Sequence, residues 1–442
     1  LLKFLNPYGF VAQLGGQTPI NMAPAIADQG FKLLGSSLEA IDLAEDRGRF
    51  VEVCRKAGFK VPRSGMASAE GMALKIAEEI GYPVICRPSY VLGGRRMELI
   101  ENSEEMQSYF SRHGAFISQD TPCLMDQFLD RALEVDVDLV RGVDWQVVGG
   151  IIEHIEAAGV HSGDSMGVVP PQRLKDEVCL KIEEMSQLLA DKLGILGFLN
   201  LQLAIKDDEI FMLEANPRSS RSVPFIAKAT GVPLVDLGVR AMIGETNETV
   251  ESKNYDWHRI SKVSVKGVVF PFKKFTESDS ILGPEMKSTG ESMGRGSDYS
   301  EALLKAMFSS QVKMPLSGEV FFSLRDKDKE ELLPVAKGLL EMGFTLSATG
   351  GTAAFLSQRG LPVTKINKVH EGRPHCVDRI RSGLVSIVIN TTSGRQSIEA
   401  SFGIRRSCVD YSIPCITESD AAVAFLLALQ KHHSGDFKVF SL

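Results

Sequence analysis

The chain has 442 residues, of which 44% are hydrophobic and 24% are charged, and its formal net charge at pH 7 is −7. This length predicts roughly two to four domains with large cores. The negative net charge and the lack of a basic stripe interleaved with aromatic residues argue against general nucleic-acid binding, and no apolar run reaches the ~18 residues of a membrane span.

The amino terminus, Leu1 to Phe4, has no initiator methionine, no signal-peptide pattern and no transit-peptide bias. A buried strand from Val11 leads into a Gly-rich turn and a helix, but so short a segment cannot form an α/β domain alone, so we expect the chain to begin inside a domain. The seven cysteines are scattered and never form a CxxC pair. This argues against structural zinc or a disulfide framework and favours a reducing cytoplasm.

Helix and strand signals then alternate as far as Gly244. We expect one helix over 40–58, because acidic residues stand near its start and basic residues near its end, and a second helix over 67–80. A short strand follows over 84–87.

Arg87 and the pair Gly93-Gly94 lie at the end of that strand. Glycines lack a Cβ, so backbone N–H groups here could approach phosphates, although a plain turn also explains a bare Gly-Gly pair. An arginine at the end of a buried strand needs an anionic partner, which is either a phosphate or a structural carboxylate.

The segment 154–165 holds two histidines, one glutamate and one aspartate around two glycines. These side chains could form a metal site. They could equally clamp a substrate, with His161 donating a hydrogen bond to an anionic intermediate, or they could be satisfied structural residues.

A hairpin is the most informative element of the sequence. An apolar strand over 199–205, a charged turn over 206–209 and a returning strand over 210–214 bring Gln202 within about one residue of lying opposite Glu214.

Glu214 and Asn216 are two residues apart on the returning strand and therefore share a face. With Gln202 they supply a carboxylate and two amide oxygens, which are hard ligands suited to Mg²⁺ that carries nucleotide phosphates. Arg218 adds a fork-shaped donor for a transferring phosphoryl group. From the spacing alone, a hairpin with polar residues on a wet face remains an equal alternative.

Beyond a polar connector over 245–259 and a mixed stretch over 263–311, a new alternation of strands and helices begins at Gly318. It predicts a compact parallel-sheet domain of about 125 residues. The expected elements are strands over 320–324, 345–348 and 385–390, helices over 329–342 and 421–430, and a turn at Gly350-Gly351.

Several polar residues of this last domain fall near strand ends and tight turns, where open α/β sheets bind ligands. They are Lys329, Thr349, Thr352, Lys368, Asn390, Thr391 and Thr392. Lysines and hydroxyls suit a phosphate, and no acid–base pair accompanies them, so we expect binding without catalysis. Solvated loop residues are the alternative.

Motifs along the whole chain together resemble the carbamoyl-phosphate synthase large subunit. Four of them are Gln13-Leu-Gly-Gly-Gln-Thr-Pro, Arg87-Pro-Ser-Tyr-Val-Leu-Gly-Gly, Glu153-His-Ile-Glu-Ala-Ala-Gly-Val-His-Ser-Gly-Asp-Ser and Glu214-Ala-Asn-Pro-Arg. Lys368-Val-His-Glu-Gly-Arg-Pro-His and Asn390-Thr-Thr-Ser-Gly-Arg resemble its carboxy-terminal regulatory domain. The likeness is to the second of that subunit's two homologous ATP-grasp halves.

The resemblance implies roles for matching positions. The nucleotide and phosphate contacts would be Arg47, Arg87, Gly93, Gly94, Gln127, Leu129, Glu134, Gly159, Val160, His161 and Ser162. The ligands of Mg²⁺ or Mn²⁺ would be Gln202, Glu214 and Asn216, and Arg218 and Arg221 would stabilise the transferred phosphoryl group. By this likeness the chain phosphorylates carbamate with ATP.

The last domain resembles a methylglyoxal-synthase-like effector module. The resemblance places Lys329, Thr349, Thr352, Lys368, Asn390 and Thr392 at nucleotide contacts, and Glu156, Asp164, Glu285 and Thr417 in an ornithine pocket. Uridylate, ornithine and inosinate are the effectors of bacterial relatives. Gly350 and the run from Asp420 depart from the family pattern, which leaves the effector open.

We therefore expect an α/β protein, an α+β ATP-grasp followed by a Rossmann-like parallel-sheet regulatory domain. The expected divisions are 1–41 (a truncated α/β segment), 42–247 (ATP-grasp), 248–313 (connector and remainder of that half) and 314–442 (regulatory domain). The implied partners are an amino-terminal synthetase half and a glutaminase subunit or domain, in a cytoplasmic synthase that serves arginine and pyrimidine biosynthesis. The alternatives are another ATP-grasp ligase, such as a biotin-carboxylase-like protein, and a non-catalytic nucleotide-sensing fragment.

Overall fold

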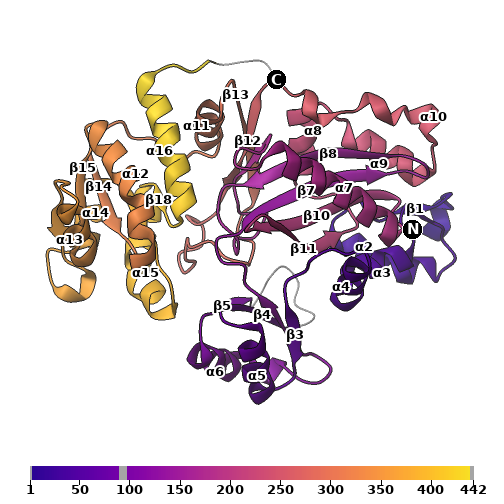
Figure 1. Cartoon of the computed structure of the whole chain (residues 1–442), viewed down its shortest axis with the longest axis horizontal. Coiled ribbons are helices and arrows are strands. Elements are labelled where there is room, and N and C mark those ends of the chain that lie inside the picture. Colours follow the sequence, from indigo (N-terminus) through magenta and orange to yellow (C-terminus); the bar gives the residue numbers. More distant parts are fainter. Residues whose placement is uncertain (1, 89–96, 439–442) are drawn as a thin grey trace.

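The computed structural model describes residues 2–88 and 97–438, and Figure 1 shows three parts: a large lobe, a small lobe beneath it and a third domain at the carboxyl end. The described residues form sheets of two, four, seven and five strands. Within these ranges no helix has both the length and the apolar character that crossing a membrane requires.

The first segment has the expected order of strand, turn and helix. Its two short strands pair in parallel over a small core that includes Ala12 and Ile20. The elements are α1 (Leu2–Leu5), β1 (Phe10–Val11), α2 (Gln17–Ala27) and β2 (Leu33–Leu34).

The single helix expected over 40–58 is wrong, because two helices meet at Asp46. α3 (Leu38–Glu45) ends there and α4 (Arg47–Lys56) begins. The Asp46 backbone is extended, and its carboxylate accepts a hydrogen bond from the Arg49 amide at 2.8 Å. An aspartate in this position caps a new helix instead of continuing the old one.

The small lobe is an antiparallel four-stranded sheet in the order β3-β6-β4-β5. Its strands are β3 (Ser64–Ala67), β4 (Val84–Pro88), β5 (Glu98–Ile100) and β6 (Cys123–Gln127), and its helices are α5 (Glu70–Ile80), α6 (Ser103–His113) and the 3-10 turn η2 (Gly114–Phe116). The strand expected over 84–87 is confirmed. The helix expected from residue 67 begins only at Glu70, because Ala67 is buried at the end of β3 opposite Cys123.

The large lobe is built on an antiparallel seven-stranded sheet in the order β11-β10-β7-β8-β9-β12-β13. Its strands are β7 (Leu133–Arg141), β8 (Gln146–His154), β9 (Gly167–Val169), β10 (Gly197–Lys206), β11 (Glu209–Asn216), β12 (Val263–Val269) and β13 (Gly290–Gly296). The sheet thus continues past residue 247 through β12 and β13.

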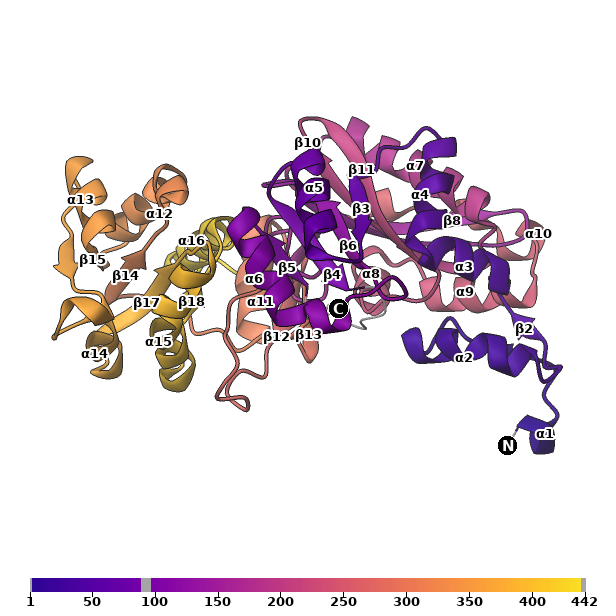
Figure 2. The same ribbon diagram turned by 90° about the horizontal axis from the view of Figure 1, so that it is seen from below.

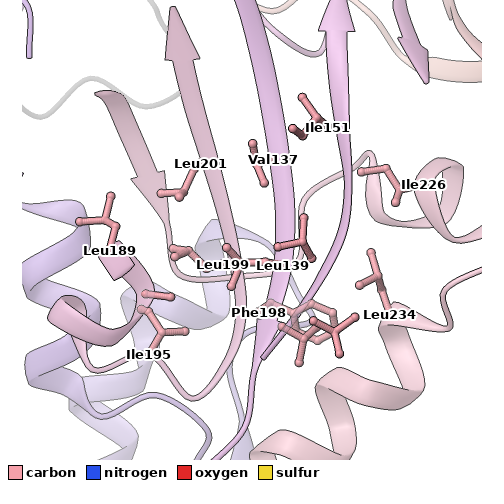
Figure 3. Packing of buried hydrophobic residues seen from close by; sticks show 14 of the residues in the cluster. Val137, Leu139, Ile151, Leu189, Ile195, Phe198, Leu199, Leu201, Ile226 and Leu234 are labelled. Atoms are coloured by element: carbon pink, nitrogen blue, oxygen red, sulfur yellow. The ribbon is translucent and has the colours of Figure 1, made fainter. Parts of the chain in front are cut away.

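Helices cover both faces of this sheet, as Figure 3 shows around β7 and β10. Leu189 of α7 (Asp176–Leu193) packs on one face, and Ile226 of α8 (Val223–Thr230) and Leu234 of α9 (Leu234–Ile243) pack on the other. A Cβ on Gly238 of α9 would lie 2.1 Å from the ring of Phe198, so only glycine lets this helix approach the sheet so closely.

The stretch expected to be a polar connector over 245–259 links α9 to β12 through short helical turns. It contains α10 (Asn247–Val250) and the 3-10 turns η3 (Ser252–Asn254) and η4 (Trp257–Arg259). Val250 and Trp257 are buried in the core of the large lobe, so two apolar residues anchor an otherwise polar segment.

The parallel-sheet domain expected from Gly318 is confirmed, with all five strands parallel in the order β16-β15-β14-β17-β18. Its strands are β14 (Glu319–Ser323), β15 (Thr345–Thr349), β16 (Thr364–Ile366), β17 (Val385–Asn390) and β18 (Cys415–Ile416). Its helices and 3-10 turns are η5 (Asp326–Asp328), α12 (Lys329–Glu341), α13 (Gly350–Gln358), η6 (Val369–Glu371), α14 (Cys376–Arg381), α15 (Arg395–Tyr411) and α16 (Ser419–Ser434). The turn expected at Gly350-Gly351 is instead the first turn of α13.

The last domain shares a core with the large lobe. Met307 of α11 (Tyr299–Ser309) and Val265 of β12 belong to the same buried cluster as Phe425 of α16 and Leu332 of α12. Figure 2 shows α16 and α11 between the parallel sheet at one end and α2 at the other. The two parts are therefore packed together and not merely tethered.

Candidate functional site

Two rows of polar side chains run across β7, β10 and β11. Gln202 pairs directly with Glu214 and Asp136, and Asn200 pairs directly with Asn216 and Asp138. The hairpin is thus confirmed, with its turn at 207–208. A bulge after Gln202 shifts the register of the strand beyond it.

Hydrogen bonds fix how the predicted metal ligands are turned. The Gln202 amide donates to Ser162 Oγ at 2.9 Å, and Asn216 donates to Glu214 Oε1 at 2.9 Å. Because the two NH₂ groups are used in these bonds, the amide oxygens and the second oxygen of Glu214 are the atoms available to a cation. This donor set fits a hard divalent ion.

Arg218 lies directly beside this set. Its Nη2 donates to Asn216 Oδ1 at 3.2 Å, and its Nε donates to Gln17 Oε1 at 3.2 Å. Gln17 in turn donates to Glu45 at 2.8 Å. The first segment of the chain therefore holds an arginine that stands 201 residues further along the sequence.

Gln13 holds the loop at residues 217–219, which carries Arg218. Its side chain is buried and donates to Pro217 O at 2.9 Å, while its carbonyl accepts from the Ser219 amide at 2.9 Å. Sequence reasoning quoted Gln13 and Gln17 in a motif but gave neither a role, since nothing local shows which distant backbone a glutamine will bind.

The segment 159–162 lies against the polar rows, because Ser162 accepts a hydrogen bond from Gln202. His161 Nδ1 accepts from the Gly163 amide at 3.0 Å, so its proton is on Nε2. Burial lowers the pKa of His161, which keeps the ring neutral with Nε2–H as its donor. In residues 2–88 and 97–438 no group of three or more His, Cys, Asp or Glu side chains could hold a metal ion, so the metal interpretation of 154–165 is not supported.

Lys266 and Arg221 approach the same segment from β12 and from the loop before α8. The buried Lys266 ammonium donates to Ser162 O at 2.8 Å. Arg221 Nη1 donates to Ser288 Oγ at 3.1 Å, and Ser288 donates to Gly163 O at 2.9 Å. Lys266 was missed, although a lysine inside an otherwise apolar strand is a visible signal for a buried cationic role.

His154 is buried between two carboxylates of β7. Its Nδ1 lies 3.6 Å from Glu134 Oε2 and its Nε2 lies 3.2 Å from Asp136 Oδ2. Burial alone would lower the pKa of His154, but the two carboxylates outweigh burial and raise it to about 9. Glu134 also accepts from the Gly159 amide at 3.3 Å, which ties the 159–162 segment to β7.

A small apolar cluster lies at the far end of the hairpin, next to Leu129. Leu129, Ala132 and Ala204 are buried, and Ala158, Phe211 and Leu213 pack against them. Such a surface suits a flat apolar ring. Gln127, two residues before Leu129, accepts from Arg63 Nε at 3.3 Å.

Two predicted phosphate contacts flank one carboxylate. Arg47 Nη2 lies 3.0 Å from Asp126 Oδ1, and Arg87 Nη2 lies 3.7 Å from Asp126 Oδ2. Arg47 also donates to Leu213 O of β11, which joins the small lobe to the hairpin. Arg87 thus has a carboxylate partner on the neighbouring strand. Gly93 and Gly94 lie outside the described residues.

The polar residues predicted in the last domain gather at the carboxyl edge of its parallel sheet. Thr349 and Asn390 end their strands, and both are buried. Lys329 donates to Gly351 O at 3.2 Å at the start of α13. Thr352 accepts from the Leu324 amide at 3.1 Å, Lys368 is exposed, and the Thr392 carbonyl accepts from Arg325 at 3.3 Å.

A cavity of about 550 Å³ lies between the last domain and the large lobe. Glu156, Asp164 and Thr417 all line it, as does Glu418. Burial raises the pKa of Glu156, and it raises the pKa of Glu418 to about 7. The fourth residue predicted for this pocket, Glu285, is exposed and does not line the cavity.

Two family models match the chain. The model described as "Carbamoyl-phosphate synthase L chain, ATP binding domain" matches residues 46–250, and the "MGS-like domain" model matches residues 331–417. Carbamoyl phosphate synthase large chains are similar over nearly the whole chain: the protein of Xanthomonas campestris pv. campestris is 44% identical over 98% of this chain, and that of Neisseria meningitidis serogroup B is 43% identical over 100%. The chain spans only 41% of the length of each of these curated relatives.

Solved structures show the same fold at low identity. Biotin carboxylase from Campylobacter jejuni superposes with a TM-score of 0.56 at 16% identity, covering 70% of this chain and 76% of that one. An N5-carboxyaminoimidazole synthase from Aspergillus clavatus gives 0.53 at 15%, covering 66% and 79%. The antiparallel sheet of the large lobe and the small lobe beneath it thus have the ATP-grasp fold. The two domain models, and the relatives that are similar along nearly its whole length, show that this chain carries the ATP-binding domain of the carbamoyl-phosphate synthase large chain, followed by an MGS-like domain.

Proposed function

We propose that the chain phosphorylates carbamate with ATP to give carbamoyl phosphate, as one half of a glutamine-hydrolysing synthase. The observation that carries the proposal is the joining of Gln202, Glu214 and Asn216 on one polar face with Arg218 bonded to it. The choice of reaction is supported by the names of the curated relatives, which are carbamoyl phosphate synthase large chains.

ATP is assigned to the space between the two lobes. The apolar cluster around Leu129 and Ala204 receives the adenine ring. Arg87 of β4 meets the phosphates from the small lobe, and Arg47 of α4 meets them from the large lobe. The remaining nucleotide contacts are assigned to Gly93, Gly94, Gln127, Glu134, Gly159, Val160, His161 and Ser162.

Mg²⁺ or Mn²⁺ is assigned to Gln202, Glu214 and Asn216. A bound divalent ion would neutralise charge on the nucleotide phosphates. The biotin carboxylase domain of Hydrogenobacter thermophilus 2-oxoglutarate carboxylase, a structure of the same fold with a TM-score of 0.56 at 17% identity, was solved with the magnesium salt of ADP and bicarbonate. It supports the assignment of a divalent ion to this fold but does not choose between the two metals.

Three side chains are assigned to the reacting groups. Arg218 and Arg221 present fixed positive charge to the phosphoryl group, and neutral His161 donates through Nε2–H to the carboxylate end of carbamate. Charges held in place before the reaction lower the barrier without reorganising when it occurs.

The relatives are longer than this chain, which spans 41% of their length, and this supports assigning further parts to the enzyme. An amino-terminal synthetase half and a glutaminase would supply carbamate, in a cytoplasmic enzyme of arginine and pyrimidine biosynthesis. We therefore expect the purified chain to make no carbamoyl phosphate from bicarbonate, glutamine and ATP.

The reverse partial reaction tests the proposal. The purified chain is expected to form ATP from carbamoyl phosphate and Mg·ADP, measured by a coupled luminescence assay. A biotin-carboxylase-like ligase would not use carbamoyl phosphate, and a nucleotide sensor would bind Mg·ADP without turnover. A folded sample that binds Mg·ADP yet forms no ATP would sink the proposal.

The last domain is proposed to regulate the reaction. A nucleotide such as uridylate is assigned to Lys329, Thr349, Thr352, Lys368, Asn390 and Thr392. Ornithine is assigned to the cavity beside Glu156, Asp164 and Thr417, where buried carboxylates suit an ammonium group. Glu285 completes this set only if its exposed side chain turns toward the cavity.

Replacing Lys368 by alanine should weaken uridylate binding by about tenfold or more, since a hydrogen bond to a charged group contributes roughly 1.5–3 kcal/mol. Titration calorimetry on the whole chain measures this. Lys337→Ala is the control, because Lys337 is another exposed lysine, on α12; this variant should bind uridylate like the unchanged chain. Equal affinities for the Lys368 variant and the control would remove Lys368 from the site.

A further inference from the structure

Asp138 is a buried carboxylate that stands directly behind the metal-ligand hairpin. It is 2% exposed, and it pairs with Asn200 in the row that ends at Asn216. Neither the family descriptions nor the resemblance gives it a role, yet both of its oxygens are engaged by groups that lead to the reacting residues.

One oxygen of Asp138 starts a relay of amides. Asn200 Nδ2 donates to Asp138 Oδ1 at 3.1 Å, and Asn216 Nδ2 is 3.4 Å from Asn200 Oδ1. An ionised carboxylate only accepts hydrogen bonds, whereas a side-chain amide can face either way. Asp138 therefore obliges Asn200 to turn its NH₂ inward, which leaves the Asn200 oxygen for the NH₂ of Asn216.

The end of this relay is the oxygen of Asn216. With its NH₂ group directed to Asn200 and Glu214, Asn216 must present Oδ1 to the site, where Arg218 Nη2 donates to it at 3.2 Å. A flipped amide would place two N–H donors against a cation and an arginine. The orientation of the Asn216 amide therefore decides whether this side chain attracts or repels the cation and Arg218.

The second oxygen of Asp138 holds the arginine loop. Ser222 Oγ donates to Asp138 Oδ2 at 2.7 Å, and Ser220 Oγ lies 2.8 Å from Ser222 Oγ. Arg218 and Arg221 belong to the same short loop, which runs into α8. One carboxylate thus touches both the metal-ligand hairpin and the loop that carries the phosphoryl-binding arginines.

Asp138 is charged under ordinary assay conditions. Burial raises its pKa to about 6, although the serine hydroxyls and Asn200 oppose the rise. Above neutral pH the carboxylate is ionised and remains an acceptor for all of its partners.

We propose that Asp138 is a positioning residue for phosphoryl transfer, which sets the orientation of the Asn216 amide through Asn200 and fixes the arginine loop through Ser222. The proposal rests on the reaction proposed above, and it goes beyond that reaction by naming the residue that aligns its two charged components.

Asp138→Asn is the decisive variant. An amide at this position can either donate or accept a hydrogen bond, so it no longer obliges the Asn200 and Asn216 amides to adopt one orientation. We expect kcat for ATP formation to fall about 10–100-fold, as for other groups that orient metal ligands, while KM for ADP changes less than about threefold. The matched control is Asp191→Asn, an exposed aspartate that bonds to Arg141 at the end of the same strand β7. We expect this control variant to have the same kcat as the unsubstituted chain.

A double substitution separates positioning from a general structural role. In an Asn216→Ala background the amide to be oriented is gone, so adding Asp138→Asn should lower kcat less than it does in the unchanged chain. If Asp138→Asn lowered kcat by the same factor in both backgrounds, Asp138 would not act through the orientation of Asn216, and the proposal would be overturned.

Hydrogen exchange gives a readout that needs no turnover. Backbone amides of residues 218–222 should exchange faster in Asp138→Asn than in Asp191→Asn, because Ser222 loses its charged acceptor. If the unchanged chain forms no ATP, the proposed reaction fails, but this comparison still decides whether Asp138 holds the loop. Unchanged exchange in that loop would overturn the proposal.

Discussion

Replacing Glu214 by glutamine should lower the rate of ATP formation from carbamoyl phosphate by about 10³-fold. Glu214 is the one carboxylate in the proposed ligand set, so the substitution removes its negative charge and keeps its shape. Unit charges about 4 Å apart at an effective dielectric constant of about 20 interact by roughly 4 kcal/mol, and each ~1.4 kcal/mol of barrier is a tenfold change in rate.

The fold should tolerate this change. Glu214 is only partly buried, and a glutamine oxygen can still accept the 2.9 Å hydrogen bond from Asn216. The control is Glu209→Gln on the same strand, where an exposed glutamate pairs with Lys60. Surface pairs of this kind contribute roughly 0–1 kcal/mol to stability, so this variant should keep full activity and a nearly unchanged melting temperature.

Calorimetric titration with Mn·ADP distinguishes a lost metal ligand from a lost catalytic group. We expect Glu214→Gln to bind Mn·ADP more weakly than Glu209→Gln does. The factor by which its affinity falls should match the factor by which its rate of ATP formation falls at subsaturating metal. A Glu214→Gln protein that turns over as fast as the Glu209→Gln protein would contradict the assignment of the hairpin to a metal.

The hairpin could be predicted because its signals are local. Two apolar runs around a charged turn define both strands, and a period of two places Glu214 and Asn216 on one face. The same period was present in Glu134, Asp136 and Asp138, where alternate carboxylates in an apolar run mark one polar face of β7. The resemblance gave a role to Glu134 alone, and Asp136 and Asp138 were missed, although the spacing contained the signal for all three.

The supports of Arg218 could not be predicted in the same way. Gln13 and Pro217 are 204 residues apart, and Gln17 reaches Arg218 across 201. Contacts of this kind depend on how separate elements pack, and a local pattern carries no information about that packing. Asp46 shows the opposite limit: one side chain that caps its own backbone divides a helix that periodicity reads as continuous.

The largest effect on stability is expected at the ion pair that joins the last domain to the large lobe. Arg405 of α15 is fully buried, and its Nε donates at 2.6 Å to Asp279, which lies in the loop between β12 and β13. Burial alone would raise the pKa of Asp279, but Arg405 outweighs it and lowers the pKa. Asp279→Asn leaves a buried guanidinium without its counter-charge, which costs about 3–5 kcal/mol.

Calorimetric unfolding should show this cost as a fall of about 6–20 °C in the transition that contains α15, since ~1 kcal/mol corresponds to about 2–4 °C in a cooperative unit of roughly 150–250 residues. The matched control is Asp410→Asn on the same helix, whose carboxylate accepts from the neighbouring Arg406 at 2.9 Å but is half exposed. It should cost less than about 1 kcal/mol. Equal shifts for the two variants would mean that the buried pair contributes no more than a surface one.

The position of this pair gives the variant a second consequence. Arg405 also donates to Asn390 at 3.1 Å, at a proposed nucleotide contact. The loop that holds Asp279 continues to Ser288, whose hydroxyl accepts from Arg221. One continuous set of contacts therefore joins the proposed effector site to a proposed phosphoryl-binding arginine. At a temperature where Asp279→Asn is still folded, uridylate should bind it but change its rate of ATP formation less than in the Asp410→Asn control, and an equal response would show that the coupling does not pass through this pair.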